Sequence, residues 1–298
     1  MEDTTIEARR DVLRAADLDA RELRQLLDLA ARMTELPCAW TEALRGDTVI
    51  LPTERRAVSD RLCLATAAHR LGMAALAVGP GELPLGRDET TVQAARELSR
   101  IGDLIAVRAD EQETVEQVAA AATVPVVNLG SDSQTPIAAL ADLLAIAERF
   151  GDLRGVAIAY VGPGEAAHAL MEACALTGTQ LTIAVPPELP LSLDVLANAE
   201  RLAAARGGEL RLVEDAVGAV AGAHVVCGGS LPETADDGEA LRRDKALARY
   251  RLDERLLEHA APAALMLRSG CGERLAERTA VLQALLYALR RGDWTGAD

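Results

Sequence analysis

Aromatic residues are scarce in this chain, whose 298 residues include one Phe, three Tyr and two Trp. Half of the residues are nevertheless hydrophobic, so the expected cores must be built from Ala, Leu and Val. No apolar run approaches the length that a helix needs to cross a bilayer, which argues against a membrane protein. The chain length allows two domains of ordinary size.

Paired cysteines and basic clusters are also lacking. The five cysteines are dispersed with no CxxC spacing, which argues against a zinc motif or a disulfide framework and favours reduced thiols. The acidic, polar start MEDTTIEARRD lacks the pattern of a signal peptide. The net charge of -15 argues against nucleic acid as a partner. We therefore expect a cytoplasmic protein with no metal and no other cofactor.

Short apolar runs alternate with amphipathic segments along the whole chain. Strands are expected at 48–51, 74–78, 104–107, 124–128, 156–161, 180–184, 209–213, 224–227 and 264–267. Helices are expected at 17–33, 60–71, 89–100, 114–121, 136–149, 166–176, 192–205, 216–221 and 277–290. The order is typical of two doubly wound α/β domains with parallel sheets. The run 74–78 reads as a buried strand, and Ser192 as an N-cap.

Residues 51–72 decide how the site should be interpreted. A strand end leads here into a charged turn that carries Glu54, Arg55, Arg56 and Asp60, and then into a helix. In α/β proteins, such a turn presents backbone N–H groups to an anion. Two interpretations stay open: a site for an anion or ampholyte, or a solvated loop whose charges pair with one another.

Several segments carry a family resemblance. NLGSDSQTPIAALADLLAIAERFGDLRGVAIAYVG (128–162) resembles the joint between the two domains of aspartate and ornithine carbamoyltransferases, and is nearest to the ornithine type. LDARELRQLLDLA (18–30), LPLGRDET (83–90) and YRLDERLLEHAAPAALML (250–267) are similar to other parts of that family. The resemblance covers nearly the whole chain and implies the carbamoyltransferase fold.

The resemblance also implies an organisation and an activity. We expect a first domain of residues 1–145, to which the closing helix 277–291 returns, and a second domain of residues 146–276. The family transfers a carbamoyl group from carbamoyl phosphate to an amine by positioning and charge stabilisation. It implies a homotrimer and a small-molecule ligand in the interdomain cleft, with carbamoyl phosphate on the first domain and the amino acid on the second.

The substrate motifs of the family differ in this chain. Its Ser-Thr-Arg-Thr-Arg phosphate loop aligns with residues 57–61 (AVSDR), which puts Asp60 where the phosphate would lie. A carboxylate a few ångströms from a bound phosphate repels it at a cost on the order of several kcal/mol. The His-Pro-x-Gln motif of the family aligns with residues 135–138 (TPIA), and the asparagines of its amino-acid site align with residues 162–166 (GPGEA). Its His-Cys-Leu-Pro motif aligns with residues 268–271 (RSGC), and one of its aspartates aligns with Gly228. Five such changes indicate that selection on ordinary carbamoyl transfer has ended.

The aligned positions supply candidate substrate-binding residues and no catalytic assignment. The candidates are Arg55, Arg56, Ser59, Asp60, Arg61, Arg108, Thr135, Glu165 and Arg268. Arg61 and Arg108 are expected to point into one cleft. Three functions stay open: a diverged enzyme that acts on a small amine or amino-acid-like substrate, an inactive family member that binds a metabolite or regulates a partner, and a structural subunit of a trimer.

Other motifs favour structural roles. Gly162-Pro163-Gly164 reads as a tight strand-to-helix turn rather than a dinucleotide fingerprint, because the third glycine is missing. His168 reads as a packed or solvated side chain rather than an acid or base, and Cys227 reads as a buried, inert thiol. Cys271 lies near Arg268, but no base is evident that would make it a nucleophile.

Overall fold

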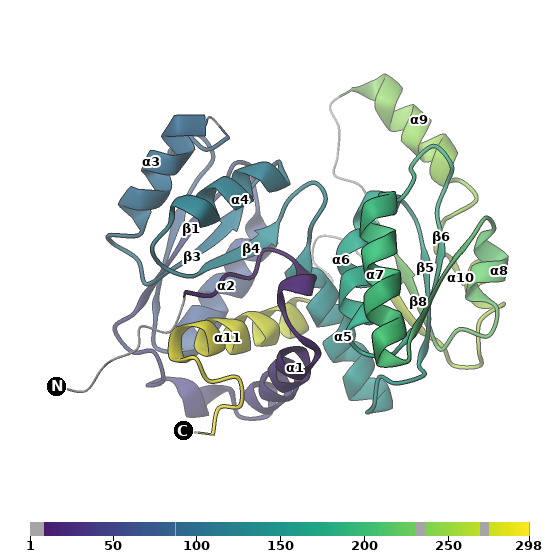
Figure 1. Cartoon of the computed structure of the whole chain (residues 1–298), viewed down its shortest axis with the longest axis horizontal. Helices are drawn as coiled ribbons and strands as arrows, with labels where there is room; N and C mark the ends of the chain where they lie inside the picture. The colour runs from purple at the N-terminus through teal and green to yellow at the C-terminus, as the bar shows by residue number, and fades with distance from the viewer. Residues whose placement is uncertain (1–8, 87, 230–235, 269–273, 298) are drawn as a thin grey trace. The chain divides into compact units, whose positions relative to one another are not determined.

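The chain falls into two units in the computed structural model (Figure 1). The structure describes residues 9–86, 88–229, 236–268 and 274–297. The described part of residues 1–13, Gln25–Ser131 and Arg278–Asp298 form unit 1, and Arg14–Arg24 and Asp132–Glu277 form unit 2. Each unit is a parallel sheet with helices on both faces, as the sequence predicts.

Unit 1 holds, within its described residues, a four-stranded parallel sheet in the order β2-β1-β3-β4. The strands are β1 (Thr48–Pro52), β2 (Ala74–Val78), β3 (Leu104–Arg108) and β4 (Val126–Gly130). The helices are α1 (Ala20–Glu35), η2 (Pro37–Trp40), α2 (Val58–Arg70), α3 (Asp88–Leu98), α4 (Gln112–Ala121) and α11 (Leu275–Arg291). Most of α1 and α11, but not their first residues, belongs to this unit.

The core of unit 1 is aliphatic. Ile50, Ile105, Val107 and Val126 point from alternate positions of three strands toward α3 and α4 and pack with their apolar residues. Helix α11 returns from the C-terminal part of the sequence, as the resemblance predicts, and is buried from Thr279 to Ala288. The sparse aromatics are therefore no obstacle to a closed core.

Strand β2 corrects one prediction. Its bounds agree with the predicted 74–78, but its side chains are exposed rather than buried, and Leu76 is 47% exposed. The cause is the sheet order, since β2 lies at an edge beside β1. A continuous apolar run does not distinguish a central strand from an edge strand that has an uncovered face.

Unit 2 holds, within its described residues, a five-stranded parallel sheet in the order β7-β6-β5-β8-β9. The strands are β5 (Ala157–Val161), β6 (Gln180–Ala184), β7 (Glu209–Val213), β8 (Val225–Gly228) and β9 (Leu265–Arg268). The helices are η1 (Ala15–Asp17), α5 (Pro136–Phe150), α6 (Gly164–Ala175), α7 (Leu193–Arg206), α8 (Ala216–Val220), α9 (Asp237–Leu247) and α10 (Glu254–Leu257). The sequence analysis did not predict η1, α9 or α10.

The turn between β5 and α6 is tight, which agrees with its structural interpretation. The Tyr160 hydroxyl donates a hydrogen bond to the Pro163 carbonyl at 2.7 Å. A Cβ at Gly164 would lie 2.2 Å from the Pro190 carbonyl oxygen, so only glycine fits there. Ser192 does precede α7, but its side chain makes no capping hydrogen bond, so that predicted contact is wrong.

Gln283 gives a testable weakness in the core of unit 1. It is fully buried in α11, and among the described residues neither of its side-chain polar atoms has a partner. We expect Gln283→Leu to raise the free energy of unfolding by about 1–2 kcal/mol, because an unpaired buried amide is replaced by an apolar group. Chemical denaturation measures the change. Gln93→Leu on the exposed side of α3 is the control, and an equal gain there would contradict this explanation.

Candidate functional site

The candidate site of unit 1 lies at the carboxyl edge of its sheet. The sheet order β2-β1-β3-β4 places β1 beside β3. From β1 the chain continues to β2 on one side, and from β3 it continues to β4 on the other side, so the direction of strand addition reverses between β1 and β3. Ligands of doubly wound sheets bind at such a reversal. Thr53 and Arg108 form a bridge at this edge, and the Glu54 N–H donates to the Arg108 carbonyl at 3.1 Å. The ends of β1 and β3 therefore bring Glu54, Arg55 and Arg108 together.

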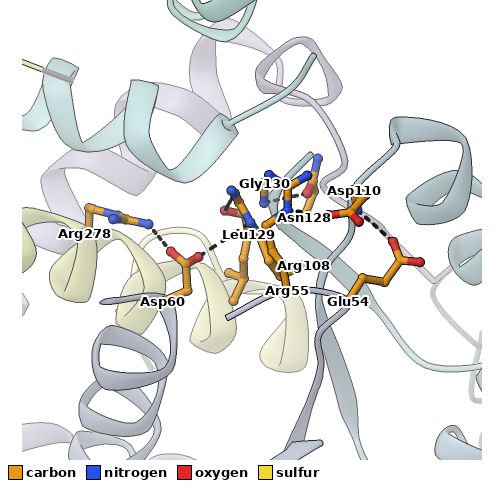
Figure 2. Close-up of polar contacts among 9 residues, drawn as sticks. All are labelled: Glu54, Arg55, Asp60, Arg108, Asp110, Asn128, Leu129, Gly130 and Arg278. Atoms are coloured by element: carbon orange, nitrogen blue, oxygen red, sulfur yellow. Dashed lines mark hydrogen bonds and ion pairs between the residues drawn. The ribbon is translucent and has the colours of Figure 1, made fainter. Parts of the chain in front are cut away.

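Asp60 is the central carboxylate of this edge (Figure 2). It lies in the first turn of α2, where the helix dipole stabilises a negative charge. One carboxylate oxygen accepts a hydrogen bond from Nη2 of Arg278 on α11. The other lies 3.8 Å from Nε of Arg108. The three side chains are only 10%, 13% and 19% exposed, respectively, so this is a largely buried ion-pair cluster.

The Arg108 side chain contacts the backbone of β4. Its Nη1 donates to the Leu129 carbonyl at 3.3 Å. Gly130, with a φ of +144°, allows this approach, since a Cβ there would lie 1.6 Å from the same nitrogen. The guanidinium is thus held by backbone on one side and faces Asp60 on the other (Figure 2).

A second ion-pair group lies beside the first. The Glu54 carboxylate accepts the Asp110 N–H at 2.7 Å, and Arg55 pairs with the Asp110 carboxylate. The charges of the turn therefore contact residues outside it, namely Asp110, Arg108 and Arg278, rather than one another, which differs from both interpretations of the turn. Across both groups, three arginines (55, 108 and 278) face three carboxylates (54, 60 and 110), so the edge is close to neutral by its own residues.

The remaining predicted residues of unit 1 lie apart from this network. Arg56 is exposed and Ser59 half-buried. Arg61 is exposed and lines an apolar pocket on the outer side of α2 and β2, together with Val58, Leu62 and Leu76. The prediction that Arg61 and Arg108 point into one cleft is therefore wrong, because successive residues of a helix point about 100° apart and Asp60 takes the inward position.

In unit 2, the predicted residues are spread over separate elements. Thr135 precedes α5 without a side-chain cap, Glu165 is exposed in the first turn of α6, and Arg268 is exposed at the end of β9. Cys271 lies outside the described residues. The structure does not bring the three described candidates into one contact group in unit 2, and an interdomain ligand site stays a prediction.

The buried titratable groups of unit 2 have structural partners. Nε2 of His168 accepts the Ser192 N–H at 3.2 Å, and burial lowers the pKa of this imidazole. Glu172 accepts hydrogen bonds from the Gln134 amide at 3.3 Å and the Ala16 N–H at 3.4 Å, and burial raises its pKa. Of the packed and solvated states expected for His168, the structure therefore shows the packed one. Glu172 was not predicted because it lies in a helix without a motif.

The described thiols and acids offer no metal centre. Burial raises the pKa of Cys174 to about 12 and that of Cys227 well above its ordinary value, so both are poor nucleophiles near neutral pH. Cys38 and Cys63 are likewise thiols outside any disulfide in the described part of the chain. No cluster of His, Cys, Asp and Glu suited to a metal occurs in the part of the chain that the structure describes. Among the same residues, no helix has the length and apolarity to span a membrane.

Sequence reasoning missed two members of the site. Asp110 has a local signal, since it follows the end of β3 by two residues, close to Arg108. Arg278 has none, because 218 residues separate it from Asp60 and only the return of α11 joins them. The structure therefore changes the role of Asp60 from an isolated negative charge to the partner of two arginines.

Family comparisons agree with this architecture. A family model described as the carbamoyl phosphate binding domain of aspartate/ornithine carbamoyltransferase matches residues 10–148. The model of the Asp/Orn binding domain of the same family matches residues 154–277. The first of these ranges includes the edge that carries Asp60 and Arg108.

Individual relatives give the same result. The ornithine carbamoyltransferase of Parafrankia sp. is 38% identical over 264 residues, which are 87% of this chain and 83% of the relative. That of Hyperthermus butylicus is 35% identical over 263 residues, 87% and 84% of the two chains. The solved ornithine carbamoyltransferase of Pyrococcus furiosus matches with a TM-score of 0.86 and 30% identity, covering 94% of this chain and 96% of that one.

Proposed function

The chain belongs to the aspartate/ornithine carbamoyltransferase family, and on that premise we propose that it has diverged from ordinary carbamoyl transfer. In this proposal, the protein acts on a small amine or amino-acid-like substrate. It does not transfer the carbamoyl group of carbamoyl phosphate to ornithine or aspartate in the usual way. One observation carries the proposal: in the domain that matches the carbamoyl phosphate model, Asp60 already pairs with Arg108 and Arg278.

Charge repulsion is the physical reason for this proposal. Carbamoyl phosphate is an anion, and phosphate is held in proteins by arginines and backbone N–H groups. In this chain, Arg108 and Arg278 already share an internal carboxylate, that of Asp60, which offsets one of their two positive charges. A substrate phosphate 4 Å from Asp60 would meet a repulsion of about 4 kcal/mol at an effective dielectric constant of 20. That repulsion disfavours the inherited binding mode.

The test is citrulline formation from carbamoyl phosphate and ornithine. We expect kcat/KM to lie at least about 10³-fold below that of the Parafrankia enzyme assayed in parallel, because 4 kcal/mol corresponds to about three powers of ten. The parallel enzyme controls for substrate quality and assay conditions. A kcat/KM within tenfold of that enzyme's would refute the proposal.

A second function, as an inactive member that binds a metabolite or serves as a subunit, is favoured by the self-paired edge. All three arginines there contact the chain's own carboxylates. A thermal-shift screen with amines, amino acids and phosphorylated metabolites separates the two functions, because a ligand of the native state raises the melting temperature. If a small amine binds but no turnover follows with any acyl or carbamoyl donor, the inactive alternative is favoured.

We also propose self-association, with a trimer as the assembly, through an apolar patch of unit 1. Val58, Leu62 and Leu76 are 62%, 58% and 47% exposed and share the pocket beside edge strand β2. Neighbouring exposed apolar side chains of this kind favour association. A cytoplasmic location is part of the same proposal, supported by the described cysteines, such as Cys38 and Cys63, being reduced thiols rather than disulfides.

Leu76→Asp tests the assembly. We expect the wild type to show the mass of a trimer in light scattering and Leu76→Asp to show the mass of a monomer, because a charge would be buried at the contact. Leu193→Asp is the control, since Leu193 is 75% exposed on α7 of unit 2. A monomeric wild type, or an unchanged mass for Leu76→Asp, would count against the patch as an interface.

A further inference from the structure

We propose that Asp60 is the specificity-determining residue of this edge, an internal anion that keeps external phosphate away from Arg108 and Arg278. The inference rests on the proposed function and adds the ligand class that Asp60 excludes, a tetrahedral oxyanion. It also assigns a role to Arg278, which no motif singled out. Removal of the carboxylate converts the same two arginines into a binding site for inorganic phosphate.

The arrangement of the side chains carries this inference. The two oxygens of one carboxylate face two guanidinium groups from different elements, Arg108 at the end of β3 and Arg278 on α11 (Figure 2). Two converging guanidinium groups are the donor set that proteins use for phosphate. Asp60 therefore occupies the position between the donors that a phosphate would need.

Burial strengthens the pairing of Asp60 with the two arginines. Arg108 and Arg278 are 19% and 13% exposed, so water replaces a lost partner poorly. With Asp60 in place, a phosphate 4 Å away binds roughly 10³-fold more weakly than to the same arginines alone. A neutral residue at position 60 removes the carboxylate that the two buried guanidinium groups share, and a dianion can take its position between them.

The Glu54 and Asp110 carboxylates contact other groups than the two buried arginines. They lie at the same edge, but Asp110 is 54% exposed and pairs with Arg55, while Glu54 accepts a backbone N–H. Asp110→Asn thus removes one negative charge from the edge without opening the two buried arginines, which makes it a matched control.

The experiment measures phosphate binding to the full chain by calorimetry and by thermal shift at constant ionic strength. We expect Asp60→Asn to bind inorganic phosphate up to about 10³-fold, and at least about tenfold, more tightly than the wild type and Asp110→Asn do, because the substitution removes the like charge of Asp60. Phosphate should also raise the melting temperature of Asp60→Asn and leave that of the wild type unchanged. Asp60→Ser, which leaves more space, serves as the second variant.

The role of Arg278 is tested in the double variant Asp60→Asn/Arg278→Leu, which should lose the gained affinity. If neither Asp60→Asn nor Asp60→Ser gains affinity over Asp110→Asn, or if the wild type itself binds phosphate saturably and is stabilised by it, the inference is overturned. The citrulline assay of the wild type does not depend on these variants. An absent gain together with absent citrulline defeats the inference alone, whereas rapid citrulline formation defeats the proposed function.

Discussion

Asp60→Asn is expected to lower the free energy of unfolding of unit 1 by about 3–5 kcal/mol in phosphate-free buffer. The reason is not the loss of a favourable ion pair alone. The variant leaves two arginines, both more than four-fifths buried, without their shared counter-ion. Denaturation followed by circular dichroism measures the change.

Asp110→Asn is again the control, since its pair with Arg55 is half exposed and should contribute at most about 1 kcal/mol. The comparison removes the same functional group from two positions of one edge. If both variants lose equal stability, Asp60 is not a buried counter-ion, and the explanation of the site fails at its first step.

Asp142→Asn is expected to have an effect of similar size in unit 2, again about 3–5 kcal/mol. Asp142 on α5 is 3% exposed at its side chain and lies 2.5 Å from Nε of Arg274, which is 12% exposed. The neutral variant leaves a buried guanidinium without that carboxylate. Denaturation measures this loss as well.

A double-mutant cycle separates this pair from general damage to the core. In an Arg274→Leu background, Asp142→Asn should cost much less, because the charge that it leaves unpaired is already gone. Glu209→Gln, which breaks an exposed pair with Arg211 at 3.8 Å, should change stability by less than about 1 kcal/mol. Additive costs of the two core substitutions would argue against a coupled buried pair.

Local patterns in the sequence predict most of the fold. The apolar runs that became β6 and β7 were predicted with their observed bounds, and the helices with one apolar face were found to within a few residues. Helix α9 was missed because it buries none of its residues, so it has no apolar stripe to detect. Helix α10 is a single turn, too short for any periodicity.

The site was predictable only in part. Alignment with the family made Asp60 and Arg108 two of nine candidate residues, and the structure places their side chains 3.8 Å apart. The alignment gave no information about Arg278, because ion pairs between distant segments depend on how helices pack. Nor did it show that Arg61 faces outward, although the side chain next to it faces inward. Side-chain direction at the start of a helix depends on where the helix begins, and α2 begins two residues earlier than predicted.

The central claim is that Asp60 takes the place of the substrate's phosphate. Calorimetric titration of the wild-type chain with freshly dissolved carbamoyl phosphate tests it most directly. With Asp60 in that place, we expect no saturable binding up to ~1 mM, the upper end of ordinary KM values. Saturable binding in the micromolar range that Arg108→Leu abolishes would contradict it.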